Sequence, residues 1–322
     1  MKTSTVLKKF STAAAGATFV VLGAMCSSAQ SVTINNGIPT GTVGSWSVDV
    51  LSGGESRVAN LTANAINPSA IVTENVLYDY FSYVDVGAPG AAFRLNTGTP
   101  VLSGTNQVTS SGSFLGSGGN TINWNVVSSI APGSPMYQNT FTFTATTGTL
   151  GDIKLYQYLD EDIEGVSDDI LYPTGSAAGG DLELYTLDNP RFFGTSQSGA
   201  FSAAQGLSNA MFAGWAANRY NNIKPAITAG TQAVSPTGVI QNLGSFSDPR
   251  LGGATVYGLA DIVSVLSWMV DPNQSTATII TALGGVPSGG DIGQKVPEPA
   301  SVLGLLTLGA LGAGSALKRK LK

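Results

Sequence analysis

Apolar and polar side chains alternate most clearly along Tyr137-Gln138-Asn139-Thr140-Phe141-Thr142-Phe143-Thr144-Ala145. Successive side chains of a β-strand point to opposite faces of its sheet. Tyr137, Phe141 and Phe143 therefore fall on one face, and the three threonines fall on the other. The stretch predicts a strand with one buried face, which is typical of an all-β domain.

Similar short runs lie on both sides of this stretch. The same alternation is found at 46–50, 122–126, 153–159 and 182–187. A longer apolar and aromatic run at 71–86 predicts one long or bent strand. Gly, Pro and Asn join the runs, as in Ala131-Pro132-Gly133, and these residues favour turns.

One segment has a spacing that favours a helix instead. Apolar residues recur at every fourth position, at Ala203, Leu207, Met211 and Trp215, and would form one stripe of a helix. Lys224-Pro225 would bound this helix, because proline interrupts helical hydrogen bonding. We expect a short helix here, packed on the sheets, with its aromatic stripe in the core.

Strand patterns return after Ala254. The runs 263–270 and 275–283 flank Asp271-Pro272-Asn273-Gln274, which we interpret as the turn of a hairpin. About ten short strands and one short helix predict an all-β fold, a two-layer antiparallel β-sandwich. The domain would cover 30–285, and a division near 196–200 is the alternative.

The first residues have the pattern of a secretory signal peptide. Lys2, Lys8 and Lys9 precede an apolar, small-residue stretch that ends at Ser27-Ser28-Ala29. This predicts a signal peptide over 1–29, cleaved between Ala29 and Gln30. Cys26 invites a lipoprotein interpretation, but Met25 is too large for that motif. Cys26 is the only cysteine, so the mature chain would have no disulfide or thiolate site.

The last residues predict a membrane span. Residues 300–317 carry no charge, and Lys318-Arg319-Lys320-Leu321-Lys322 follows. A helix over this run comes close to the roughly 30 Å of a hydrocarbon core. Basic residues mark the cytoplasmic side of a span, so the rest of the chain would lie outside the inner membrane. A buried core helix is the alternative.

Pro297, Glu298 and Pro299 stand just before this run. Residues 296–322 resemble the PEP-CTERM sorting signal, in which Pro-Glu-Pro, an apolar helix and a basic cluster occur in this order. A glycine-rich linker at 286–295 would separate this signal from the domain. The resemblance implies an exported protein whose tail is cut near Pro-Glu-Pro by exosortase, a membrane protease-transpeptidase.

Proteins with such tails belong to bacteria that have two membranes and make exopolysaccharide. The resemblance therefore implies a chain anchored at the inner membrane, then placed at the cell surface or in the extracellular matrix, with exopolysaccharide as a possible partner. It implies sorting and leaves the role of the sorted domain open.

Charge and composition exclude several functions. The chain has 15 Lys and Arg and 20 Asp and Glu. Three of the cations lie in the leader and four in the tail, which leaves eight cations against all twenty anions. This acidic balance argues against nucleic-acid binding. The chain has no histidine, which excludes Ser-His-Asp and Cys-His catalysis and imidazole metal sites.

One acidic stretch, at 160–169, holds six of the twenty carboxylates. Carboxylates this close repel one another, and a hard cation would relieve the repulsion. The simplest interpretation is a solvated acidic loop, and calcium as a cofactor of this loop is the alternative. Leu171 stands where an EF-hand needs glutamate, so the loop is not an EF-hand. The expected calcium ligands are Asp160, Asp162, Glu164, Asp168 and Asp169.

The remaining candidates concern carbohydrate. Paired carboxylates could serve a glycosidase without histidine, and the candidates are Glu74, Asp79, Asp85, Glu183 and the acidic stretch. No spacing singles out a pair, so we assign no catalytic residue. Four tyrosines near the acidic stretch could bind sugar rings, although half-buried sheet positions are the simpler interpretation: Tyr156, Tyr158, Tyr172 and Tyr185. We therefore expect a binding or structural protein, with a carbohydrate-active enzyme as the alternative.

Overall fold

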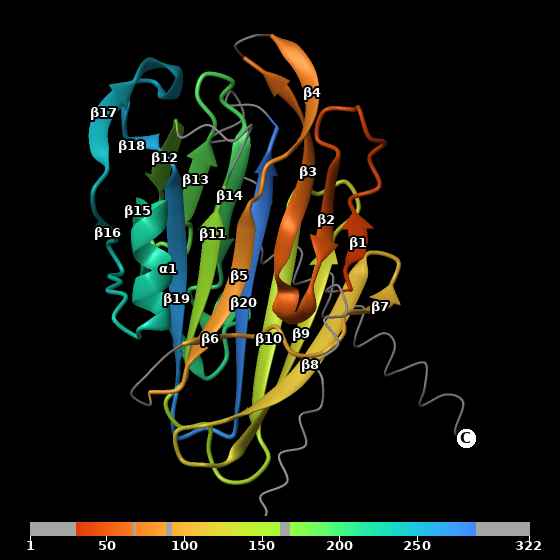
Figure 1. Cartoon of the computed structure of the whole chain (residues 1–322), viewed down its shortest axis with the longest axis vertical. Coiled ribbons are helices and arrows are strands. Elements are labelled where there is room, and N and C mark those ends of the chain that lie inside the picture. Colours follow the sequence, from red (N-terminus) through yellow and green to blue (C-terminus); the bar gives the residue numbers. More distant parts are fainter. Residues whose placement is uncertain (1–29, 67–68, 88–91, 162–167, 288–322) are drawn as a thin grey trace, which may run out of the picture.

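The computed structural model describes residues 30–66, 69–87, 92–161 and 168–287. These residues form twenty strands in two sheets that pack face to face (Figure 1). The all-β, two-layer prediction is therefore confirmed, but the estimate of about ten strands was wrong. The predicted leader and membrane span lie outside the described residues. Among the described residues, no helix is long and apolar enough to cross a membrane.

The first sheet has the strand order β1-β2-β3-β5-β11-β19-β15-β16, with β4 beside β3 and β6 beside β5. Its pairings are antiparallel except for β15 with β16, which is parallel. Its strands are β1 (Val32–Asn35), β2 (Trp46–Val50), β3 (Ser56–Ala65), β4 (Ala70–Asn75), β5 (Asp79–Asp85), β6 (Phe93–Arg94), β11 (Lys154–Asp160), β15 (Ala210–Arg219), β16 (Val239–Ile240) and β19 (Ile262–Val270).

The second sheet is antiparallel and has the order β17-β18-β12-β13-β14-β20-β10-β9-β8-β7. The stretch from which the fold was predicted is an inner strand of this sheet, β10, paired on either side with β9 and β20. Its strands are β7 (Val101–Gly104), β8 (Gln107–Leu115), β9 (Thr121–Ile130), β10 (Met136–Ala145), β12 (Asp169–Thr174), β13 (Glu183–Leu187), β14 (Gly194–Gly199), β17 (Gly244–Asp248), β18 (Ala254–Ala260) and β20 (Thr276–Val286).

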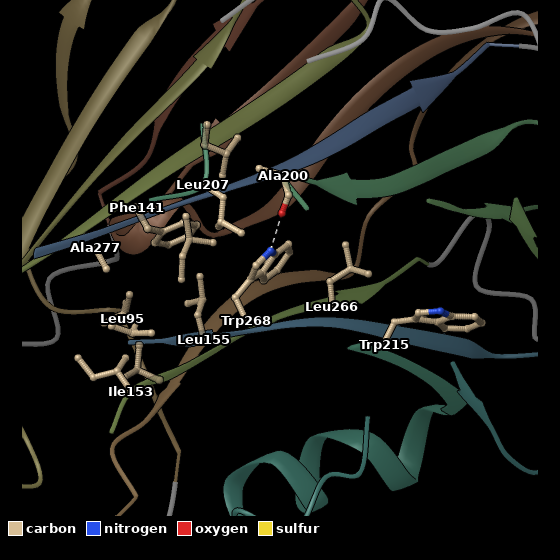
Figure 2. Close-up of a cluster of buried hydrophobic side chains, with 14 of the residues drawn as sticks. Leu95, Phe141, Ile153, Leu155, Ala200, Leu207, Trp215, Leu266, Trp268 and Ala277 are labelled. Carbon is tan, nitrogen blue, oxygen red and sulfur yellow. Dashed lines mark hydrogen bonds between the residues drawn. The ribbon is translucent and has the colours of Figure 1, made fainter. Parts of the chain in front are cut away.

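The main core lies between the sheets. Phe141 from β10 and Leu155 from β11 belong to one buried cluster with Trp268 from β19, and Figure 2 shows these side chains converging. The Trp268 indole donates a hydrogen bond to the Ala200 carbonyl at 2.8 Å. Burial of these large apolar side chains is the main favourable term in folding.

Three local predictions were wrong. The run at 71–86 is two strands, β4 and β5, rather than one. The turn at 271–274 exists, with the Gln274 N–H donating to the Asp271 carbonyl, but it joins β19 and β20, which belong to different sheets. It is therefore a crossing between layers and not a hairpin.

The helix was also misplaced. Residues from Met211 to Trp215 lie in β15, and the helix α1 is Tyr220–Thr228, which contains Pro225 instead of ending before it. Short 3-10 turns occur at Ser52–Gly54, Ala203–Gln205 and Pro249–Leu251. Helix α1 packs on the first sheet through Ile223 and Ile227, which share a buried cluster with Tyr158.

Candidate functional site

The acidic stretch begins as strand and not as loop. Asp160 is the last residue of β11, and Asp169 is the first residue of β12. Asp160, Glu161 and Asp169 are buried, with exposed fractions of 2%, 1% and 1%. The expectation of a solvated acidic loop is therefore wrong for these three residues. Asp162 and Glu164, two of the expected calcium ligands, lie outside the described residues.

Asp160 belongs to the face of the first sheet that α1 covers. Tyr158, two residues earlier on the same face, donates its hydroxyl to Asp160 Oδ2 at 3.2 Å. Burial, with the nearby Asp261 carboxylate second, raises the pKa of Asp160 to about 8. At neutral pH this carboxyl is therefore largely protonated.

Asp79 lies directly across from Asp160 in the register of β5 and β11. Its two oxygens contact two cations: Lys224 Nζ lies 2.9 Å from Oδ2, and Arg57 Nε lies 3.2 Å from Oδ1. Among the glycosidase candidates, the structure thus brings Asp79 and Asp160 together. Both residues are buried, at 1% and 2% exposed.

Glu161 follows Asp160 and points the other way, toward the second sheet. A Cβ added to Gly194, the first residue of β14, would lie 2.5 Å from Glu161 Oε1. The missing side chain at Gly194 therefore makes the space that this carboxyl occupies. Neither Glu161 oxygen has a hydrogen-bond partner. The Thr195 hydroxyl and backbone N–H lie near this carboxyl and act to lower its pKa, although the hydroxyl is outside good hydrogen-bonding geometry.

Two further carboxyls approach Glu161 from the second sheet. Ile170 of β12 pairs with Leu187 of β13, which places Asp169 and Asp188 opposite each other one residue further along. Burial is the largest of the effects that raise the pKa of Glu161 well above its usual value. The neighbouring carboxylates of Asp169 and Asp188 raise it further. Burial, with Asp188 second, raises the pKa of Asp169 to about 9. We call Glu161, Asp169 and Asp188 the buried acidic cluster.

Within the described ranges, the ion pairs of the chain involve none of Glu161, Asp168 and Asp169. One oxygen of Asp168 and one of Asp169 are also buried without a hydrogen-bond partner. No three His, Cys, Asp or Glu side chains in this part of the chain are already placed as a metal-binding group. Burial without an ion pair raises the pKa of Glu161 and of Asp169, so these two carboxyls are held in the neutral form.

Sequence reasoning did not select Asp188, and it included Glu161 only as part of the acidic stretch and not among the expected calcium ligands. The calcium-loop spacing selected Asp160, Asp162 and Glu164, so Glu161 was passed over. Strand periodicity could have found it, because Glu161 continues the inward series of Leu155 and Leu159.

The other carboxylate candidates have structural partners. Glu74 forms an ion pair with Arg191, and Asp85 accepts a hydrogen bond from the Gly87 N–H at 2.9 Å. Glu183 accepts hydrogen bonds from Tyr185 at 2.5 Å and Ser196 at 3.2 Å, and burial raises its pKa.

The four tyrosines do not form an open platform. Tyr156, Tyr158 and Tyr185 are buried, and Tyr172 is half-buried. Tyr158 also packs edge-on against Tyr83 with ring centroids 6.3 Å apart. The interpretation of these side chains as sheet residues is therefore supported over the sugar-platform alternative.

A separate polar hollow of about 960 Å³ lies on the first sheet and the segment before β7. Its deep side contains the buried Glu55, which is paired with Arg94, and the Arg94 guanidinium stacks 3.5 Å above the Phe81 ring centroid. Burial raises the pKa of Glu55, and this effect is larger than the lowering caused by the Arg94 guanidinium. Exposed polar side chains form its rim: Gln30, Ser31, Arg57, Asn96 and Thr99.

Comparison with known proteins identifies the tail. The family model described as the PEP-CTERM protein-sorting motif matches residues 295–320. The predicted sorting signal is therefore confirmed, and it indicates an exported protein that is processed by exosortase, a membrane enzyme. No curated protein matches the chain.

Among solved structures, a bacterial glucoamylase complexed with acarbose matches with a TM-score of 0.45 and 12% sequence identity. The match covers 76% of this chain and 32% of that one, so this chain spans about a third of the length of the glucoamylase. A likeness this distant carries no argument about function.

Proposed function

We propose that this chain is an exported cell-surface or extracellular-matrix protein whose β-sandwich has a binding or structural role near exopolysaccharide. The sorting motif at 295–320 is the observation that carries the proposal. A chain with this motif is exported to the outer side of the inner membrane, where exosortase processes it. The sandwich is then the part that remains to act outside the cell.

The polar hollow supports a binding role. Its rim offers amide, hydroxyl and guanidinium groups, which hydrogen-bond readily to the hydroxyls of a sugar polymer. Asn96 and Thr99 are exposed at this rim, and their side chains are accessible to a ligand without any change in the core. A hydroxylated polymer is therefore the ligand class that we propose for the hollow.

Replacing Pro297, Glu298 and Pro299 with alanine tests the sorting role. We expect this variant to accumulate as an uncut chain in the inner membrane, because exosortase would lose the segment that it recognises. Immunoblots of fractionated cells measure the outcome. A matched triple substitution in the neighbouring segment, Ser288, Gly289 and Gly290 to alanine, should be processed normally.

Normal release of the Pro-Glu-Pro variant would contradict the proposal. Failure of both variants to be processed would instead show that the composition of the whole segment matters, and that recognition is not specific to the three residues Pro-Glu-Pro.

The alternative is a carbohydrate-active enzyme, and the Asp79–Asp160 pair is the observation in its favour. One carboxyl of this pair contacts two cations, and the other has a pKa raised to about 8. Two carboxyls in such different environments are suited to separate base and acid roles. Both are closed to solvent, however, so a substrate would first need to displace α1 and its neighbours.

A further inference from the structure

We infer that Tyr78 and Tyr220 form a subsite for one sugar ring of an extended polymer, and that this subsite continues the polar hollow along the face of the first sheet that α1 covers. The inference rests on the proposed function, because it takes the ligand of the hollow to be a hydroxylated polymer. It concerns two tyrosines that were not among the four considered from the sequence.

The first argument is the exposure of the two rings. Tyr78 lies between β4 and β5 and is 50% exposed, and Tyr220, the first residue of α1, is half-buried. Their ring centroids lie 6.3 Å apart at an interplanar angle of 88°. The two rings therefore meet as a right-angled corner that solvent reaches. Within the part of the chain that the structure describes, their hydroxyls form no hydrogen bond.

The second argument is that the backbone holds both rings in place. The Tyr78 N–H donates to the Asp160 carbonyl at 3.0 Å, and the Tyr220 N–H donates to the Asp261 carbonyl at 3.1 Å. Asp160 ends β11 and Asp261 stands directly before β19, and these two strands are neighbours in the first sheet. A binding surface fixed to rigid strands loses little conformational freedom when a ligand binds.

The third argument is the chemistry beside the rings. A tyrosine ring has a partially negative face, on which the C–H bonds of a sugar ring pack, and its hydroxyl can bond to sugar hydroxyls. Lys224 lies one helical turn after Tyr220, and its ammonium donates to Asp79 Oδ2 at 2.9 Å. Among the described residues, the other two N–H groups of this ammonium have no acceptor. Aromatic rings with a few polar donors beside them are typical of a small-ligand site.

The fourth argument is continuity with the hollow. Asp79 also contacts Arg57 Nε at 3.2 Å, so one carboxyl holds both Lys224 and Arg57. The two cations lie 5.3 Å and 5.2 Å from the centroid of the Phe81 ring. Arg57 lines the hollow, and its side chain is 60% exposed. Its two terminal amino groups have no hydrogen-bond partner among the described residues. Arg57 and Lys224 thus form a polar bridge from the hollow to Tyr220.

Surface plasmon resonance of the purified full chain on immobilised exopolysaccharide from the producing strain tests the inference. We expect Tyr78→Ala combined with Tyr220→Ala to weaken binding by about tenfold, because two ring contacts are lost. Tyr78→Phe combined with Tyr220→Phe should bind more tightly than the alanine variant, because it keeps both rings. Phe246→Ala is the matched control and should bind like the wild-type chain, since Phe246 is an aromatic residue 37% exposed on β17 of the other sheet.

Nitration with tetranitromethane keeps the test decisive if the alanine variant fails to fold, because it uses the wild-type chain. We expect soluble polymer to protect Tyr78 and Tyr220 from nitration, as measured by peptide mass spectrometry. Tyr257 is half-buried on β18 of the other sheet, and its nitration should be the same with and without polymer.

The inference is overturned if a folded alanine variant binds as tightly as the wild-type chain, or if polymer leaves the nitration of both tyrosines unchanged. If Asn96→Ala with Thr99→Ala still weakens binding in that case, only the tyrosine subsite fails and the binding role of the hollow stands. A wild-type chain that does not bind the polymer at all would overturn both.

Discussion

At the residue scale, the end of β11 separates two kinds of buried carboxyl. Asp160 has a tyrosine hydroxyl as its partner, and Asp79 across the strand pair is held by Lys224 and Arg57. Glu161 and Asp169 each retain unpartnered oxygens. Asp160 and Glu161 are adjacent, but their side chains point to opposite faces of one sheet and therefore meet different neighbours.

These carboxyls make stability depend on pH. The folded-state pKa values of Asp160 and Asp169, about 8 and about 9, lie above the unfolded value of about 3.9. The folded chain therefore binds more protons between these values. The stabilising contribution is complete below the unfolded pKa and is lost as pH rises through the folded one. In EDTA, we expect the free energy of unfolding to fall from about pH 5 to about pH 9, by up to about 1.4 kcal/mol per pH unit for each proton released.

Denaturant titrations at several pH values measure this slope. Asp160→Asn should flatten it, because an amide does not titrate, whereas the exposed-site control Asp152→Asn should leave it unchanged. A stability that is level or rising over this range in the wild-type chain would contradict the assignment of these carboxyls as protonated.

Sequence reasoning at this scale succeeded where one strand face meets water. Trp46, Val48 and Val50 were predicted on one face, and all three are fully buried. The same reasoning did not extend to buried polar groups. The partners of Asp160 come from β5, α1 and the residue before β19, and no local spacing indicates which distant strands become neighbours.

At the element scale, the four-residue spacing from Ala203 to Trp215 was misinterpreted for a definite reason. A repeat of four fits one helix turn approximately, but it is also an even number and therefore fits one face of a strand. Only the part from Ala210 onward lies in β15, since Ala203–Gln205 is a 3-10 turn, and a bulge between Phe212 and Gly214 shifts the register of the strand. Met211 before the bulge is 62% exposed, whereas Trp215 after it is 4% exposed.

The connection after β19 shows a related limit. Its turn residues were recognised correctly, yet strand β20 joins the other sheet. Turn chemistry fixes where a chain reverses, and it does not fix whether the returning strand pairs with the first or packs across from it. In a sandwich that choice depends on which strands already occupy the neighbouring positions.

The polar hollow is the element-scale feature with a functional consequence. We expect Asn96→Ala combined with Thr99→Ala to weaken binding to exopolysaccharide from the producing strain by about tenfold, since each lost hydrogen bond contributes about 0.5–1.5 kcal/mol. Surface plasmon resonance on immobilised polymer measures this. Ser245→Ala with Thr255→Ala, on exposed positions of β17 and β18 in the other sheet, is the matched control.

Equal binding by the two double variants would show that the polymer binds elsewhere. The same incubations can be assayed for new reducing ends. Their release by the wild-type chain and loss in Asp160→Asn would favour the enzyme alternative over a binding role.

At the scale of the whole molecule, the chain combines a β-sandwich with a C-terminal sorting signal. The described residues from 30 to 287 supply two covered sheets and a polar hollow, and the motif at 295–320 supplies the address. The sorting signal was evident from sequence because its three parts are contiguous. The role of the sandwich was not, because it depends on groups that only the fold brings together.

Export followed by removal of the tail is the central claim, and the termini of the mature chain test it most directly. Mass spectrometry of the chain recovered from the cell surface or medium should find an N-terminus at Gln30 and a C-terminus near Pro299, without the apolar run that begins at Ala300. Recovery of the chain solely from the cytosol, with Met1 and Lys322 both still present, would contradict the account.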